Sequence, residues 1–164
     1  MTRKRSFPPV VDQQVRILIL GSLPGNVSLA HSQYYAHPQN RFWKLLAQVT
    51  AVDLPALPYP ERLQTLLAKH IGLWDVVAEA RRDGSLDSNI RDHVHNDLPS
   101  LAASLPQLTA IAFNGGTAAR LGLKALGQQA ERYRIIQLPS SSPAYTRPYA
   151  EKLAAWLALQ DCLA

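Results

Sequence analysis

The chain has 164 residues, a length typical of one domain with a substantial buried core. Its 17 lysines and arginines outnumber its 12 aspartates and glutamates, and the resulting charge of +5 favours a polyanionic partner such as nucleic acid. The single cysteine, Cys162, excludes an internal disulfide and an iron–sulfur cluster held by four thiolates of this chain. The basic N-terminus lacks the apolar core of a signal peptide, and every window of membrane-spanning length contains a charge or a proline. We therefore expect a protein of the reducing cytoplasm with no membrane segment.

Strands and helices alternate along the first half of the sequence. The apolar run "VRILIL" stops at a glycine, which is typical of a buried strand. Apolar residues recur at helical spacing between Phe42 and Val49, and Asn40 stands before them as a natural N-cap. The predicted elements are a strand at 15–20, a helix at 40–49, a proline-rich surface loop at 50–60, a helix at 61–70 and a strand at 71–77.

The second half continues the alternation after a long polar stretch. The predicted elements are a polar loop at 79–92, a short helix at 96–106, a strand at 108–113, a helix at 115–123, a strand at 133–138 and a closing helix at 147–160. Strands that alternate with helices predict an α/β fold, in which a parallel sheet is covered by helices on both faces.

Four unusual segments follow the four predicted strands. They are "GSLPGN" at 21–26, "WDVV" at 74–77, "FNGG" at 113–116 and "LPSSSPAYTRP" at 138–148. Because the carboxyl ends of parallel strands meet at one edge of a sheet, these segments should lie together, and ligands of open α/β sheets bind at that edge. The sequence therefore predicts a binding site there.

Several general motifs fit these segments poorly. "GSLPG" lacks the glycines of a dinucleotide-binding turn and the Lys-Ser/Thr pair of a phosphate-binding loop, and no G-x-S-x-G elbow surrounds Ser140–Ser142. "FNGG" either cradles a phosphate or serves only as a turn. "HVH" at 93–95 has no carboxylate or cysteine cluster nearby, so we expect a solvated loop and no metal site. Serine hydroxyls beside prolines suit contacts with phosphates.

Two blocks of the sequence carry a resemblance to a known family. They are "LGSLPG…QYYAHPQNRFWK", within residues 20–44, and "LPSSSPA" at 138–144. They resemble the uracil-DNA glycosylase superfamily, and the versions here, together with "GSLDS", are most similar to its hypoxanthine-DNA glycosylase branch. The resemblance spans most of the chain. It implies one glycosylase-like domain over 1–164, built as a three-layer α/β/α sandwich around a four-stranded parallel sheet, and cofactor-free excision of a base flipped out of the duplex.

The resemblance assigns catalytic and stacking roles within the first block. Tyr35 stands where the family places its stacking aromatic, and its alternative role is loop packing. Relatives of the mismatch-specific branch carry a water-positioning Asn where this chain has Leu23, so the nearest replacement is Asn40, which is otherwise only a helix cap. The histidine of efficient uracil enzymes is replaced by Leu138, so we do not expect efficient uracil removal from every context.

Base reading and DNA binding are assigned to the other segments. Asp75 can accept the N–H of hypoxanthine N1 or uracil N3, whereas adenine N1 carries no proton; its alternative role is a turn cap or a pair with Arg81 or Arg82. The remaining base-binding candidates are Gly21, Ser22, Pro24, Gly25 and Asn114, and the DNA-binding candidates are Pro139, Ser140, Ser141, Ser142, Pro143 and Arg147. Arg41 and the basic N-terminus are further candidates for phosphate contacts.

We therefore expect a monofunctional DNA glycosylase that hydrolytically removes deaminated bases from double-stranded DNA. Hypoxanthine is the preferred substrate, with uracil and xanthine as further candidates, and the protein should act as a monomer without metal or cofactor. The alternative is a catalytically weak or inactive DNA- or nucleotide-binding protein of the same fold, because Leu23 and Leu138 remove two polar groups.

Overall fold

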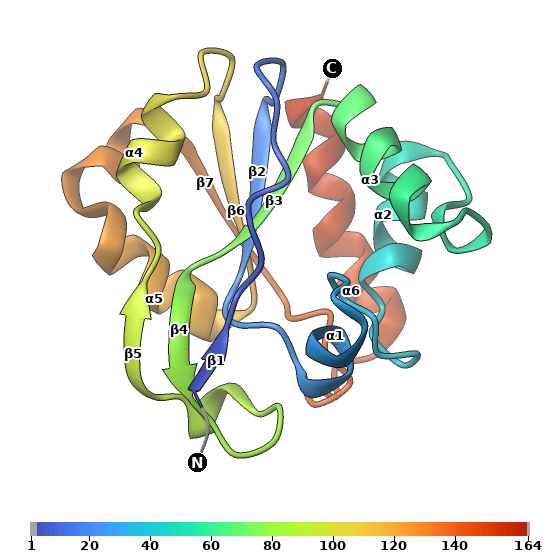
Figure 1. Cartoon of the computed structure of the whole chain (residues 1–164). Coiled ribbons are helices and arrows are strands. Elements are labelled where there is room, and N and C mark those ends of the chain that lie inside the picture. The colour runs from blue at the N-terminus through green and yellow to red at the C-terminus, as the bar shows by residue number, and fades with distance from the viewer. Residues whose placement is uncertain (1–2, 164) are drawn as a thin grey trace.

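The computed structural model of the chain describes residues 3–163, which fold around a four-stranded parallel sheet (Figure 1). Its strands are β2 (Ile17–Gly21), β3 (Ile71–Asp75), β6 (Ala110–Asn114) and β7 (Arg134–Leu138). They lie in the order β3-β2-β6-β7, and each neighbouring pair is parallel. The central strands are buried on both faces, as their unbroken apolar sequences predict.

Helices cover both faces of this sheet and complete three layers (Figure 1). The helices are α2 (Phe42–Thr50), α3 (Tyr59–Ala68) and α6 (Tyr149–Trp156) on one face, and α4 (Leu98–Ala103) and α5 (Gly116–Leu126) on the other. Short 3-10 helices span Leu54–Ala56, Asp87–Asn89, Gly127–Arg132 and Leu157–Cys162. A separate hydrophobic cluster lies on each side of the sheet. The predicted α/β/α sandwich is confirmed.

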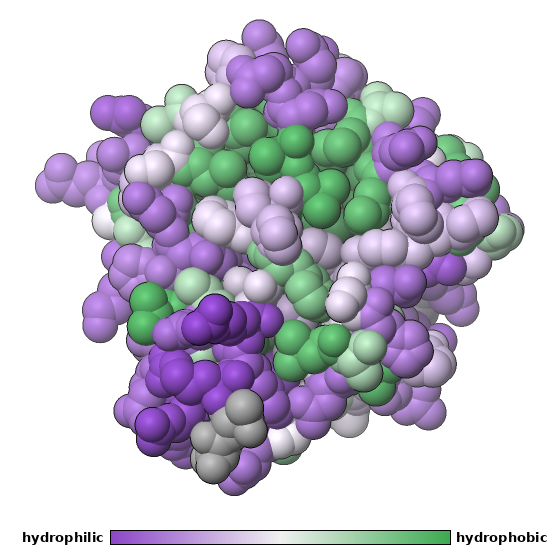
Figure 2. Space-filling model, viewed as in Figure 1, coloured by the Kyte–Doolittle hydropathy of each residue, from purple (hydrophilic) through white to green (hydrophobic). Residues whose placement is uncertain are grey.

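A second, three-stranded antiparallel sheet lies beside the first one, and the predicted polar loop at 79–92 is wrong at both of its ends. The strands β1 (Arg3–Arg5), β4 (Val77–Arg81) and β5 (Arg91–His95) pair in the order β1-β4-β5. Every residue of β5 is exposed, so no apolar pattern marks it. Its pairing with β4, and that of β4 with the N-terminus, come from long-range contacts that the local sequence does not show. Figure 2 shows hydrophilic residues gathered over this sheet at the lower left.

The "HVH" segment therefore lies on an exposed edge strand rather than in a loop. Among residues 3–163, no group of three or more His, Cys, Asp or Glu side chains is arranged to hold a metal ion. None of the helices described is long and apolar enough to cross a membrane.

The segment between β2 and α2 contains a short helix that the sequence analysis missed, α1 (Asn26–His31). Helix α2 then begins at Phe42, two residues later than Asn40, where the predicted helix starts. The Oδ1 atom of Asn40 accepts a hydrogen bond from the Phe42 amide at 2.9 Å. Asn40 therefore satisfies one of the free amides of the first turn, although Arg41 occupies the N-cap position itself.

The adjacent tyrosines have different positions: Tyr34 packs in the interior, and Tyr35 lies at the edge of the sheet. Tyr34 is buried: its hydroxyl donates to the Pro8 carbonyl at 3.0 Å, its carbonyl accepts from Trp43 Nε1 at 3.1 Å, and its amide donates to the Tyr59 hydroxyl at 2.9 Å. These bonds hold the segment against α2 and α3, and Tyr34 does not line the cavity described below. Tyr35 is left to face the carboxyl edge of the sheet.

The Phe42 ring is expected to be a major contributor to stability. It is fully buried, stacks on Tyr35 at 3.8 Å between ring centroids, and packs edge-on against Trp43 and Trp156 at 5.0 and 5.8 Å. Phe42→Ala should lower the free energy of unfolding by about 3–5 kcal/mol, because it removes these contacts and leaves a cavity. Urea unfolding measures the loss. Val94→Ala, at an exposed position of β5, should stay within about 0.5 kcal/mol of wild type, and a similar loss in both variants would contradict the prediction.

Candidate active site

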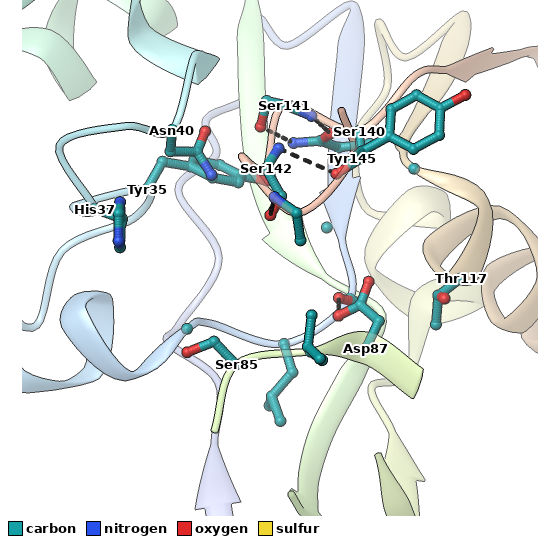
Figure 3. Close-up of a pocket in the computed structure, with 18 of the residues that line it drawn as sticks. Tyr35, His37, Asn40, Ser85, Asp87, Thr117, Ser140, Ser141, Ser142 and Tyr145 are labelled. Carbon is teal, nitrogen blue, oxygen red and sulfur yellow. Dashed lines mark hydrogen bonds between the residues drawn. The ribbon is translucent and has the colours of Figure 1, made fainter. Parts of the chain in front are cut away.

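A cavity of about 670 Å³ opens at the carboxyl edge of the parallel sheet (Figure 3). Residues from all four segments that the sequence predicted to converge line it: Gly21, Ser22, Leu23, Gly25, Asp75, Asn114, Gly115, Gly116, Ser140, Ser141, Ser142 and Pro143. Tyr35, His37 and Asn40 come from the segment before α2, and Ser85–Ser88 from the loop between β4 and β5. The four segments therefore come together at one edge of the sheet, as the sequence predicted.

Gly21 stands between the two polar groups at the base of this cavity. A Cβ atom on Gly21 would lie 2.7 Å from Asp75 Oδ1 and 2.8 Å from the Tyr35 hydroxyl oxygen, so a side chain there would displace one of these groups. Gly21 and Asp75 lie directly opposite each other in the paired strands β2 and β3. One face of the Tyr35 ring is covered by Phe42, and Tyr35 adopts a φ of 55°, which is uncommon for a residue with a bulky side chain. The tyrosine is thus fixed in a strained position at the cavity.

The carboxyl group of Asp75 is buried at the end of β3. Burial first, and then the charge of Asp87, raise the pKa of Asp75 from 3.8 to about 7, against the opposing charge of the Arg82 guanidinium. Among the residues that the structure describes, Asp75 Oδ2 has no hydrogen-bond partner, although the atom is buried. Buried polar atoms normally have partners, so this oxygen is suited to contact a ligand in the cavity.

Asp87 is a second acidic residue of the cavity, and the sequence analysis did not assign it. Its Oδ1 atom accepts a hydrogen bond of 2.6 Å from Ser22 Oγ. Burial raises the pKa of Asp87, while the Ser22 hydrogen bond and the charge of Arg82 lower it. The signal was present in "GSLDS", but the loop that carries it was not predicted to reach the edge of the sheet. Two carboxyl groups therefore share the cavity, and the charge of Asp87 disfavours the ionisation of Asp75.

Arg82 fastens the loop that carries Asp87 to the turn after β2. Its guanidinium, almost fully buried, donates to the carbonyls of Pro24 at 2.6 Å, Leu23 at 3.3 Å and Gly84 at 2.8 Å. The structure describes no ion pair between Asp75 and either arginine of the predicted alternative, and Arg81 instead pairs with Asp92 at 3.8 Å. Arg82 therefore acts on Asp75 through its charge, while its hydrogen bonds fix the shape of the cavity.

The serine loop, residues 139–143, is held by Asn114 at the end of β6. Asn114 Oδ1 accepts from the Ser141 amide, and Asn114 Nδ2 donates to Ser141 Oγ, both at 2.9 Å. Ser141 is consequently buried, whereas Ser140 and Ser142 are half-buried on the wall of the cavity. Gly115 approaches the loop so closely that a Cβ atom there would lie 3.1 Å from Ser140 Cβ.

Asn40 lies on the wall that faces the serine loop, beside Tyr35 (Figure 3). The amide of the next residue, Arg41, donates to the Ser141 carbonyl at 3.0 Å and joins the two walls. After its bond to the Phe42 amide, the Asn40 side chain keeps one lone pair on Oδ1 and both hydrogens on Nδ2. The Asn40 side chain can therefore bond the first turn of α2 and still contact a ligand in the cavity.

Three of the predicted site residues do not line this cavity. The Pro24 carbonyl accepts a hydrogen bond from Arg82, and the Pro139 carbonyl accepts one from Trp156 Nε1 at 2.9 Å. Both prolines therefore help to fix the loops but do not line the cavity. Arg147 lies next to the cavity, with its guanidinium carbon 5.4 Å from the centre of the Tyr145 ring. The functional assignments of the site residues stay predictions.

Comparison with known proteins agrees with this architecture. The family model of the uracil DNA glycosylase superfamily matches residues 8–160. The chain belongs to this superfamily. Members of the superfamily are hydrolytic N-glycosylases, and the resemblance identified from the sequence is confirmed.

The similar proteins include curated relatives and a solved structure. Two relatives, each named hypoxanthine DNA glycosylase, are both 40% identical: that of Methanosarcina barkeri over 94% of this chain and 96% of its own length, and that of Methanosarcina acetivorans over 95% and 97%. The solution NMR structure of a candidate uracil DNA glycosylase from Methanosarcina acetivorans has a TM-score of 0.85, with 39% identity over 99% of both chains.

The buried carboxyl group predicts an unusual dependence of stability on pH. Because the pKa of Asp75 is about 7 in the folded protein and near 3.8 in the unfolded chain, the folded state retains a proton that the unfolded state releases between these values. The free energy of unfolding should therefore fall as pH rises through this window, by about 4 kcal/mol from this group alone.

Asp75→Asn should remove most of this fall, and the variant should be the more stable protein at pH 8. Urea unfolding of both proteins at a series of pH values between 5 and 8 measures the effect. Asp161→Asn, at an exposed position, should keep the wild-type pH dependence. If Asp75→Asn keeps it too, Asp75 ionises at its ordinary pKa.

Proposed function

We propose that the protein is a DNA repair glycosylase that removes hypoxanthine from DNA by hydrolysing the N-glycosidic bond. The observation that carries this proposal is the 40% identity to two hypoxanthine DNA glycosylases over nearly the whole length of each chain. The cavity at the sheet edge supplies what such a reaction needs, namely room for a base, an aromatic ring and polar groups that are free to bind it. Uracil and xanthine are further candidate substrates.

A flipped base is proposed to enter this cavity and contact Tyr35 and Asp75. Extrusion from the duplex costs a few kcal/mol, and stacking on an aromatic ring returns about 1–3 kcal/mol. The Tyr35 ring is backed by Phe42, so it offers its other face without a further loss of freedom. In its ionised form, the carboxylate of Asp75 accepts the N1–H of hypoxanthine. Adenine N1 carries no hydrogen for this form to accept, which disfavours the undamaged base.

The proposed chemistry breaks the bond between C1′ of the sugar and the base nitrogen. The bonding electrons leave with the base, a water oxygen forms the new bond to C1′, and overall the proton that this water loses neutralises the departing base. Asn40 is the group that we assign to this water or to the transition state, because it can both donate to and accept from it. The cavity also contains Gly115–Thr117 at the N-terminus of α5, whose amides favour the negative charge that develops on the departing base.

The proposed partner is double-stranded DNA that contains a deaminated base, bound by a monomer. Ser140, Ser142, Pro143 and Arg147 surround the mouth of the site and are assigned to the strand that carries the lesion. The excess of basic residues favours the DNA backbone in general. The proposal places this activity in the cytoplasm, which suits a chain with a single cysteine.

Base release from matched duplexes tests the function. Each duplex carries one hypoxanthine, uracil or xanthine, and a gel shift with the same duplexes measures binding. Hypoxanthine should be released fastest, and a duplex with adenine at that position should stay intact. Binding to the lesion duplex without release of any base would overturn the proposal and favour an inactive DNA-binding protein.

Asn40→Ala should lower the single-turnover rate of hypoxanthine release by more than tenfold, or at least about 1.4 kcal/mol of transition-state stabilisation. It also removes the bond to the Phe42 amide, which should cost about 1 kcal/mol of stability. The matched control is Asp97→Ala, which removes the cap of α4, where Asp97 accepts from the Ser100 amide at 3.2 Å. The control should lose similar stability and keep its rate. Wild-type rates in both variants would show that Asn40 is only a cap.

Removal of divalent metal should leave base release unchanged. The proposed reaction uses only side chains, amides and water, and residues 3–163 contain no group of three or more His, Cys, Asp or Glu that could hold a metal ion. The rate on hypoxanthine DNA is measured before and after dialysis against EDTA. A loss of activity that added zinc or magnesium restores would contradict the prediction and would direct attention to His93 and His95 on β5.

A further inference from the structure

A second, smaller cavity of about 290 Å³ lies beside the serine loop, next to the base cavity. Gln39, Arg41, Thr146, Arg147, Tyr149 and Lys152 line it, and it shares Pro143 and Tyr145 with the larger one. The sequence analysis assigned Arg41 and Arg147 to phosphate contacts without placing them in one cavity, and Tyr149 and Lys152 were not candidates. The two cavities therefore meet on opposite sides of one short segment of chain.

This cavity is strongly and only positively charged. Three of its lining side chains are cations, Arg41, Arg147 and Lys152, and none of those described there is acidic. The ion pairs within residues 3–163 join other arginines to Glu79 and Asp92. Both burial and the nearby charge of Arg41 lower the pKa of Lys152, as expected where like charges are brought together. An anion in the cavity would remove this repulsion.

Lys152 is held in place, and Arg41 lies near an aromatic ring. The buried stem of Lys152 leads to an ammonium group that donates to the Ser142 carbonyl at 3.1 Å and lies 5.5 Å from the centre of the Tyr145 ring. The Arg41 guanidinium carbon lies 5.9 Å from the centre of the Tyr149 ring. Side chains that are already ordered lose little freedom when a ligand binds, so this arrangement suits a specific anion better than a diffuse counter-ion cloud.

We propose that this cavity binds one backbone phosphate of the lesion strand, adjacent to the flipped nucleotide, through Arg41, Arg147 and Lys152. The inference rests on the proposed function, because it takes DNA as the partner and the larger cavity as the base site. A phosphodiester offers acceptor oxygens that match guanidinium and ammonium donors. Since the cavities share Pro143 and Tyr145, the backbone of a nucleotide whose base occupies the larger one must pass this segment.

The assignment is tested by combining substitutions in the protein with changes to single phosphates of the DNA and measuring the affinity of each combination. The probe is a duplex with one 2′-fluoro-deoxyinosine, which resists hydrolysis, so binding is read without base release and a failure of the glycosylase activity stays distinguishable. Single phosphates around the lesion are replaced in turn by uncharged methylphosphonates. The protein variants are Arg41→Gln and Lys152→Met, with Lys69→Met as the matched control at an exposed position at the opposite end of the sheet.

Arg41→Gln and Lys152→Met should each weaken binding about tenfold, and the slope of log affinity against log salt should fall by up to about 0.9. One methylphosphonate beside the lesion should weaken wild type and the Lys69→Met protein, yet have little further effect on either cavity variant. Lys152→Met also removes the hydrogen bond to the Ser142 carbonyl. Arg41→Gln gives the cleaner result, because the Arg41 side chain makes no hydrogen bond to the described residues.

Two results would overturn the proposal. In the first, every methylphosphonate acts equally on the wild-type and variant proteins, so the cavity contacts no particular phosphate. In the second, the variants bind the duplex as wild type does, while inorganic phosphate shifts the NMR signals of this cavity in wild type only, which would make it a site for a free anion.

Discussion

Both cavities depend on the way Asn114 fixes the serine loop to the end of β6. Two buried hydrogen bonds of 2.9 Å join its side-chain amide to the amide and hydroxyl of Ser141. The carbonyls of Ser141 and Ser142 are in turn held by the Arg41 amide and the Lys152 ammonium. Breaking one of these bonds leaves a buried polar group without a partner, so the loop has one favourable position. The same short segment thus sets one wall of the base cavity and one wall of the cationic cavity.

The charges at the base of the larger cavity oppose stability. Burial of Asp75 disfavours its ionised form at neutral pH, and Asp87 adds repulsion, while Arg82 compensates only through space and uses its hydrogen bonds on backbone carbonyls. Gly21 leaves room for the Asp75 carboxyl group and the Tyr35 hydroxyl, and the pairing of β2 with β3 does not itself require an acid opposite that glycine. A buried carboxylate oxygen without a partner is therefore explained more readily by a ligand than by the folding of the sheet.

The elements that local sequence patterns determine were predicted, and the elements that depend on pairing between distant segments were missed. Unbroken apolar runs such as Ile17–Leu20 identify the parallel strands, and the positions of those strands place Asp75 and Asn114 at one edge. The exposed strand β5 has no apolar pattern and exists because β4 pairs with it, so the loop that brings Asp87 to the cavity went unrecognised. The sequence assigned Arg41 and Arg147 to phosphate contacts but missed the cavity, because Lys152 lies on α6 and meets Arg41 only in the folded chain.

Chemistry and base stacking are linked through the first residues of α2. Leu23 lines the cavity with an apolar side chain, so the turn after β2 cannot orient water by a side chain at that position, and Asn40 faces the cavity from the other wall. Asn40 also accepts from the amide of Phe42, and the Phe42 ring supports Tyr35, which is held at a positive φ. The group proposed to handle water and the ring proposed to receive the base therefore share one support. A shift of this helix end would move both, which explains why the start of α2 is fastened to the serine loop through Arg41.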